Sequence, residues 1–565
     1  MKNKLSFSLK LLLTVSLENS ISFSYSNKKE KSPIAYYGQF KSIPANTITP
    51  KGWLKQYQIN QRNGLTRHLE NAGCSFNSVG WVSDSIPGNI SIEKCWPYEH
   101  NGYWINGMER CGLLLKGTFL LKKAHKSIYY VLHRLDRNGF LVPKYNELDK
   151  WVYVVFFRAW MAKYDATKNP VILVATKNHN LNSRFVYTGV GVRESANIEE
   201  FLWAYAKSKD TALLNYAKEI YKNSNETNKI PMISDIGFLK DSTSADKHGV
   251  IYLEKSKLGA ILYLYTGDSS YLKPSVAAFR KLDKYCMLID VVNVFSEHIQ
   301  KPTTQESHET CDISDFTWSI SYLLKAACDA FYTDKLERAA FNADTGSVTK
   351  DFKALQYFST PNQIIAARNS FIRDGGGSIR YAPNPGTECC PVNVNRVMPN
   401  FAINSWMSDG NGRLVAPSSV THPVDENNTK ATIDEVTYYP FSDTVTLTFH
   451  LKENTRFNFH VRILGWCNNA QVFVNKKSLN MDISPDAYIT ISHTYKGGDE
   501  ILVILPSKFK LVHGPENGIA VVKGPLVYTL KIQDDWKVDS LDNCSIKDFP
   551  AYELFAKRPC NYALC

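Results

Sequence analysis

The pattern of hydrophobic and polar positions changes once along this chain, near residue 410. From about residue 50 to about 408, apolar residues recur every three or four positions, as in residues 198–205, 213–221 and 319–331. This spacing places apolar side chains on one face of an α-helix. Because a single helical hairpin cannot bury its apolar face, a long succession of hairpins has to stack or close into a ring. The pattern therefore predicts a helical toroid or solenoid over residues 31–408.

After residue 410, polar and apolar residues alternate, as in residues 444–451, 457–463 and 500–505. Alternation with many β-branched residues, interrupted by Gly, Asn and Asp, is typical of strands. Several short strands at this spacing predict a β-sandwich over residues 409–535, in which residues 518–528 form a strand, a turn and a strand. Residues 536–565 show no regular pattern, and we expect them to be an incomplete C-terminal segment.

The first 30 residues resemble an export signal followed by a flexible segment. Lys2 and Lys4 precede a short apolar stretch at residues 11–17. That stretch is too short to span a bilayer, and no later segment without charges reaches the necessary length. We therefore expect a secreted or periplasmic protein without a transmembrane segment.

Composition and charge exclude some classes of protein. The chain has 565 residues, of which 44% are hydrophobic and 21% charged, so wholesale disorder is excluded. Its net charge is +12, but the lysines are scattered rather than gathered in runs, and no nucleic-acid partner is predicted. The twelve cysteines have no regular spacing, so a disulfide framework is not implied.

Two segments carry the candidate chemistry. Glu309 and Cys311 stand two residues apart, and Cys389 and Cys390 are adjacent. Together they offer three sulfurs and one carboxylate, which is a ligand set that suits tetrahedral zinc. Since the two segments are distant in sequence, their spacing leaves open both a metal site and a group of buried thiols.

The same segments contain candidates for acid and base catalysis. A metal-bound thiolate could act as a nucleophile, with Glu297 as the acid. Glu297 could instead be a solvated loop residue. In a metal-free alternative, Glu297 pairs with another carboxylate and the cysteines are structural; the candidates are Glu306, Glu309 and Asp312.

Residues 306–318 and 388–393 resemble the β-L-arabinofuranosidase family of glycoside hydrolases, glycoside hydrolase family 127. The resemblance covers most of the chain from about residue 40 to about 560, in one order. It includes further short matches at residues 52–54, 64–66, 103–107, 248–250, 356–358 and 524–528.

This resemblance implies an (α/α)6 barrel catalytic domain followed by a β-sandwich domain. It also implies a zinc ion bound by Glu309, Cys311, Cys389 and Cys390. Cys389 would be the nucleophile and Glu297 the acid/base, while His248 and Tyr357 would contact the substrate.

The implied activity is retaining hydrolysis that releases terminal β-L-arabinofuranose from plant-type glycans, with an oligo- or polysaccharide as the partner. Two alternatives stay open at this point. One is a carboxylate-only glycosidase that acts on another sugar, and the other is a non-catalytic carbohydrate-binding protein.

Overall fold

A computed structural model describes the fold of this chain. It covers residues 34–72, 81–82, 96–135, 139, 141, 150–183, 192–226, 231–370, 372, 376–386, 388–409, 414–415, 419–423, 429–479 and 481–558. The export signal predicted in residues 1–30 lies outside these residues. Within them, no helix combines the length and the apolar character that crossing a bilayer requires.

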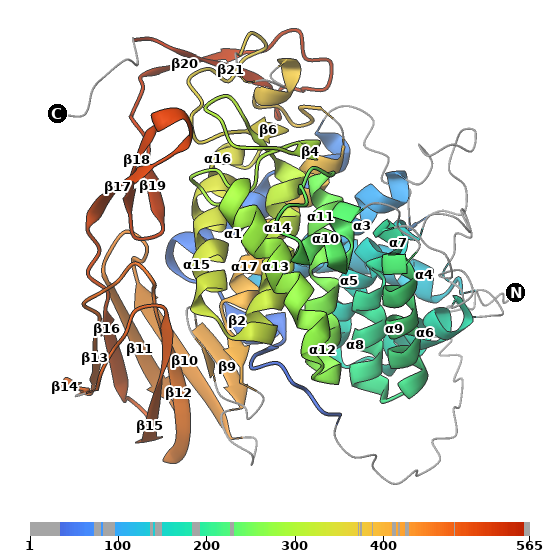
Figure 1. Ribbon diagram of the computed structural model, residues 1–565, viewed down its shortest axis with the longest axis vertical. Coiled ribbons are helices and arrows are strands. Elements are labelled where there is room, and N and C mark those ends of the chain that lie inside the picture. Colours follow the sequence, from blue (N-terminus) through green and yellow to red (C-terminus); the bar gives the residue numbers. More distant parts are fainter. Residues whose placement is uncertain are drawn as a thin grey trace, which may run out of the picture. The chain divides into compact units, whose positions relative to one another are not determined.

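Helices make up most of the chain between residues 52 and 404 (Figure 1). They are α1 (Gly52–Asn63), α2 (Leu65–His68), α3 (Trp96–Leu115), α4 (Thr118–Leu132), α5 (Trp151–Thr167), α6 (Pro170–Ser183), α7 (Val192–Ser195), α8 (Ile198–Ser208), α9 (Thr211–Glu226), α10 (Asp235–Leu239), α11 (Gly249–Ser256), α12 (Leu258–Thr266), α13 (Ser269–Tyr285), α14 (Thr310–Ala327), α15 (Ala330–Arg338), α16 (Thr345–Ser347) and α17 (Cys389–Asn404).

The helices form an inner and an outer set, as a helical barrel requires. α5 is buried at every position from Trp151 to Lys163, and α17 is buried from Cys390 to Asn404. Helices that are buried on every side are covered by other elements, so these two helices lie inside. α9 and α13 instead bury one face and expose the other. The predicted helical barrel is confirmed.

Turn chemistry joins the helical hairpins. α12 ends at Gly267, whose φ of 68° is left-handed, and the Asp268 side chain then accepts a hydrogen bond of 2.9 Å from the Ser270 amide to begin α13. Glycine tolerates this conformation and Asp is a favoured N-cap residue. The residues Thr266-Gly267-Asp268 therefore separate α12 from α13.

Two larger sheets make the sandwich that follows the helices (Figure 1). One sheet has the order β1 (Lys41–Ser42), β7 (Met407–Ser408), β8 (Leu414–Val415), β12 (Thr455–Ile463) and β15 (Ala487–Tyr495). The other has the order β14 (Lys477–Ser478), β13 (Gln471–Val474), β16 (Glu500–Ile504), β11 (Thr444–His450), β10 (Lys430–Thr437), β9 (Ser419–Pro423) and β2 (Ile48–Thr49).

Alternation along the strands fills the space between the sheets. In β11, Val445, Leu447 and Phe449 are buried while the residues between them are not. Phe449 stacks on Tyr495 of β15, with ring centroids 4.4 Å apart. The predicted β-sandwich is confirmed.

Two short strands near the start of the described chain also belong to the sandwich sheets. β1 and β2 lie within the range assigned to the helical domain, yet they pair with β7 and β9 at the edges of the two sheets. Strands of two residues are too short to show an alternating pattern, so the sequence could not reveal them.

The C-terminal part of the described chain has more regular structure than its sequence indicated. Residues 518–528 form the expected strands, β18 (Ile519–Lys523) and β19 (Leu526–Tyr528), in a sheet with β17 (Phe509–His513). Beyond them, β20 (Asp534–Val538) pairs with β21 (Tyr552–Ala556), where no regular structure was predicted. Every residue of β21 is half-buried, so no alternation of burial or polarity marks this strand.

Buried charges join the sandwich to the helices. Arg462 of β12 lies 3.2 Å from a carboxylate oxygen of Asp334 and 2.5 Å from one of Glu337, both on α15. The Tyr439 hydroxyl also donates to Glu337, over 2.8 Å. Because Arg462 and Glu337 are both buried, removing one would leave the other charge without compensation.

Replacing Arg462 with alanine is therefore expected to lower the free energy of unfolding by about 3–5 kcal/mol, the usual result of breaking a buried ion pair. Urea denaturation followed by fluorescence measures this. The matched control is Arg456→Ala, on the exposed side of the same strand, which should change the free energy by less than about 0.5 kcal/mol. Equal effects of the two variants would contradict this role of Arg462.

Candidate active site

Two helices begin at the candidate site. α14 starts at Thr310, directly after Glu309, and α17 starts at Cys389. Glu309 belongs to the short strand β5 (His308–Glu309), which pairs with β6 (Phe358–Ser359). The Thr310 hydroxyl donates to the Gln356 carbonyl over 2.8 Å, and this fixes the start of α14 against the same segment.

The four predicted metal ligands come together at these two helix starts. One ligand atom of each of Glu309, Cys311, Cys389 and Cys390 lies within 4.8 Å of all the others. The sulfurs of Cys311 and Cys390 are 3.5 Å apart, and Glu309 Oε1 lies 3.5 Å from the Cys390 sulfur and 3.8 Å from that of Cys389. Only Cys389 is half-buried; the other three are buried, so the cluster opens on the Cys389 side.

The protein alone stabilises the charged forms of these groups poorly. Burial raises the pKa of the Glu309 carboxyl well above its usual value, and burial likewise raises the pKa of the Cys311 and Cys390 thiols. Glu309 Oε2 is buried and has no hydrogen-bond partner in the described part of the chain. A cation among these atoms would satisfy the carboxylate and hold the thiols as thiolates, and the two helix N-termini would add favourable dipoles. The chemistry of the donors therefore fits a metal ion.

A hydrogen-bonded chain behind the cluster orients one of the thiols. The Asn393 amide donates to the Cys311 sulfur over 3.1 Å, and Arg396 donates to the Asn393 side-chain oxygen over 2.7 Å and to Asp315 over 2.6 Å. Sequence reasoning gave Asn393 no role and missed Arg396. Their positions four and seven residues after Cys389 place them on the same face of a helix, and this spacing is the signal that could have found them.

Glu297 lies at the tip of a short hairpin, between β3 (Phe295–Ser296) and β4 (His298–Ile299), with a left-handed φ of 65°. A non-glycine residue in this conformation is uncommon and is found where a site imposes it. The side chain of Glu297 is 52% exposed. An acid that has to reach a sugar needs this accessibility.

Both predicted substrate contacts touch Glu297. The Tyr357 hydroxyl donates to Glu297 Oε1 over 2.6 Å, and His248 Nε2 lies 3.5 Å from Glu297 Oε2. The hydrogen bond from His248, together with that from Tyr357, lowers the pKa of Glu297 despite its partial burial. The Tyr357 hydroxyl is also 4.0 Å from the Cys389 sulfur. The structure thus brings all seven predicted site residues into one connected group.

A further pair beside the nucleophile candidate was missed from the sequence. His100 Nδ1 lies 3.2 Å from the carboxylate of Glu388, the residue before Cys389. Burial alone would lower the pKa of His100, but the hydrogen bond with Glu388 and nearby negative groups raise it. Nothing in the sequence links these residues, because His100 lies on α3, far from Glu388 along the chain.

The carboxylates of the metal-free alternative are less accessible. Glu306 is 1% exposed and Asp312 is fully buried. Burial and the neighbouring Asp315 raise the pKa of Asp312 well above its usual value. A sugar could reach Glu297 but not these two side chains, so neither can pair with Glu297 across a glycosidic bond.

The chain thus combines a helical barrel, a β-sandwich and a thiol cluster beside an accessible carboxylate. Residues 188–402 match the family model of the β-L-arabinofuranosidase, GH127 catalytic domain. Residues 414–507 match the model of the GH127 middle domain. The two models together match more than half of the chain. The chain belongs to glycoside hydrolase family 127 and is a glycosidase.

Solved structures share the whole architecture. A glycoside hydrolase aligns with a TM-score of 0.72 at 15% identity, covering 94% of this chain and 92% of that one. A GH127 β-arabinofuranosidase aligns with a TM-score of 0.68 at 17% identity, covering 93% of this chain and 96% of that one. A GH127 β-L-arabinofuranosidase from Geobacillus stearothermophilus T6 aligns with a TM-score of 0.64 at 16% identity, covering 90% of this chain and 97% of that one. At these identities the likeness concerns the fold. No curated protein matches the chain.

The contact between Asn393 and Cys311 leads to a prediction about metal affinity. Asn393→Leu removes the donor to the sulfur at nearly constant volume, and we expect divalent metal affinity to fall about 10–100-fold, as is usual when such a supporting contact is lost. Competition with a coloured chelator measures this. Asn404→Leu is the control at the other end of α17, where the side chain donates to the Asn400 carbonyl. Unchanged affinity in Asn393→Leu would contradict the role of Asn393.

Proposed function

We propose that the protein is a retaining β-L-arabinofuranosidase that releases terminal β-L-arabinofuranose from plant-type glycans. One observation carries the proposal: the Tyr357 hydroxyl contacts both the Glu297 carboxylate and the Cys389 sulfur. A candidate acid and a candidate nucleophile therefore face one small space, as a retaining mechanism needs. The family membership and the names of two structural relatives support the choice of sugar.

We further propose that the metal is zinc. Bond lengths of about 2.3 Å to sulfur and about 2.1 Å to oxygen give a tetrahedral site with ligand-to-ligand distances of roughly 3.6–3.8 Å. The contacts of 3.5 Å and 3.8 Å within the cluster are close to these distances. Glu309, Cys311, Cys389 and Cys390 would hold the ion. Bound zinc would keep the thiols deprotonated at neutral pH.

In the first step, the Cys389 sulfur attacks the anomeric carbon and forms a C–S bond while the bond to the leaving oxygen breaks. Glu297 gives its proton to that oxygen. In the second step, Glu297 takes a proton from water, whose oxygen attacks the same carbon and breaks the C–S bond. Two inversions return the original configuration, and Cys389 is again a thiolate.

The surroundings of Glu297 suit the base role. The hydrogen bond from His248, together with that from Tyr357, lowers the pKa of Glu297. The ionised carboxylate is the form that accepts a proton from water in the second step.

We also propose that the protein is exported. The predicted signal in residues 1–30 motivates this, and Cys544 is disulfide-bonded, which suits an oxidising compartment. The thiols of Cys311, Cys389 and Cys390 are free, as a metal site requires.

Cys389→Ala tests the function directly. We expect the rate of release from an aryl β-L-arabinofuranoside to fall by at least about 10⁴-fold, because removing a nucleophile leaves only binding and positioning. Cys328→Ala is the control, since this thiol is also partly buried and lies outside the cluster. Metal content is measured in parallel. Zinc near one ion per wild-type chain is expected; activity without any bound metal would support the carboxylate-only alternative instead.

Glu297→Gln tests the acid/base role. In this variant, the rate of the first step should depend strongly on the leaving group, because an aryl alcohol of low pKa leaves without receiving a proton. We therefore expect near-normal release of the first equivalent of such an aryl alcohol, followed by turnover slowed by about 10²–10⁴-fold. Asp246→Asn, an exposed carboxylate that contacts His298, is the control. A uniform loss for all leaving groups, with no initial burst, would exclude Glu297 as the acid/base.

A further inference from the structure

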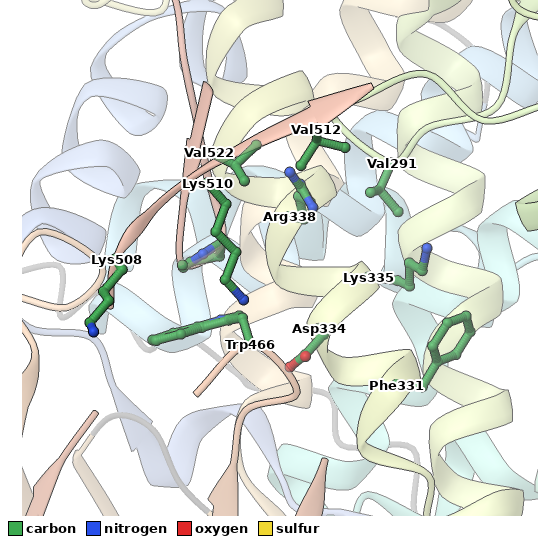
Figure 2. A pocket seen from close by; sticks show the side chains of 12 residues that line it. Val291, Phe331, Asp334, Lys335, Arg338, Trp466, Lys508, Lys510, Val512 and Val522 are labelled. Atoms are coloured by element: carbon green, nitrogen blue, oxygen red, sulfur yellow. The ribbon is translucent and has the colours of Figure 1, made fainter. Parts of the chain in front are cut away.

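A cavity lies away from the active site. It has a volume of about 290 Å³ and lies between α15, the loop after β12 and the sheet formed by β17, β18 and β19. Figure 2 shows its lining, in which Lys510 extends toward Trp466 and the Asp334 side chain lies beside Trp466. None of the residues that line it belongs to the active site. Ligand sites are common at junctions of this kind.

Four basic side chains line the cavity: Lys335, Arg338, Lys508 and Lys510. The nearby carboxylates of Asp290 and Asp334 offset part of the charge of Arg338. Among the residues that the structure describes, the buried Nε and Nη2 atoms of Arg338 have no hydrogen-bond partner. Buried N–H groups without an acceptor are costly, and in native proteins such groups usually meet a ligand, an ion or water. Lys508 and Lys510 are exposed and form no ion pair within the described part of the chain. Lys335, which also lines the cavity, is paired with Asp283.

The carboxylate in the lining, Asp334, is an acceptor for hydroxyl groups. Asp334 accepts from the Gly465 amide over 2.9 Å and from Arg462 over 3.2 Å. A carboxylate has about four lone-pair sites, so Asp334 can accept further hydrogen bonds. An anionic ligand would keep its charge away from Asp334 and place its hydroxyl groups there.

Trp466 supplies a flat apolar surface. The turn between β18 and β19 approaches it closely at Gly524, whose φ is 58° and where a Cβ atom would lie 3.2 Å from the indole ring. Asn342 holds this turn, since its amide donates to the Pro525 carbonyl over 2.9 Å. The Trp466 ring is therefore fixed on one edge and borders the cavity.

We propose that this cavity binds an acidic saccharide. Arg338 and Lys510 bind the carboxylate, Trp466 contacts the sugar ring, and Asp334 accepts from the hydroxyl groups. A volume near the lower limit of about 300 Å³ for ligand pockets fits one sugar unit. The site would hold the enzyme on an acidic glycan while the active site acts on a neutral terminal sugar. It is separate from the proposed chemistry, because it uses no residue of the metal cluster.

Calorimetric titration of the full-length protein with methyl α-D-glucuronide tests the proposal. We expect binding at least about tenfold tighter than that of methyl α-D-glucoside, because charge-assisted hydrogen bonds are lost with the carboxylate. Arg338→Gln and Lys510→Gln should each remove most of this preference. Lys510 is exposed, so its variant tests the site even if Arg338→Gln fails to fold. Lys531→Gln, an exposed lysine outside the cavity, should bind like the wild type.

Two further measurements separate the possible results. One result would show a simple anion site and overturn the proposal. In that result, inorganic phosphate competes fully with the glucuronide, Trp466→Phe binds the glucuronide like the wild type, and Trp466→Ala leaves the affinities for both saccharides unchanged. Equal affinity for glucuronide and glucoside, or no binding of either, would also overturn it. Because neither probe contains arabinofuranose, failure here with normal hydrolysis of the aryl arabinofuranoside would leave the proposed function untouched.

Discussion

The structure depends on one electrostatic constraint: three thiols and a carboxylate are held within 4.8 Å of one another at the starts of two helices. Burial raises the pKa of the Glu309 carboxyl and of the Cys311 and Cys390 thiols, so the charged forms require a cation in their midst. The barrel brings α14 and α17 together, and the pairing of β5 with β6 fixes Glu309 between them. Asn393 and Arg396 then orient one sulfur from behind.

The same arrangement leaves one side of the cluster reactive. Cys389 is the half-buried member, and it faces Tyr357 rather than the protein core. Tyr357 in turn contacts Glu297, whose left-handed backbone conformation places its carboxylate at the tip of a hairpin. The site therefore combines a rigid, buried half that can hold a metal and an accessible half that can meet a sugar. This division lets one thiol serve as both ligand and nucleophile.

Much of this could be predicted, for identifiable physical reasons. The helical period and the strand alternation gave both main domains, because long elements repeat their pattern many times. The ligand set came from Glu309, Cys311 and the adjacent cysteines, whose short spacings limit where the side chains can point. Long-range pairs were not accessible in this way: nothing in the sequence joins His100 to Glu388, or β1 to β7. The cavity beside Trp466 was missed for the same reason, since its lining comes from segments distant in sequence.

The central claim is that Cys389 forms the covalent bond to the sugar. The most direct measurement is peptide mapping by mass spectrometry of the Glu297→Gln variant, quenched during its reaction with an activated aryl β-L-arabinofuranoside. The account predicts one added pentosyl group, located on the peptide that carries Cys389 and attached to its sulfur. A pentosyl group on Glu309, or on any other carboxylate, would contradict it, and so would the absence of an adduct while turnover continues.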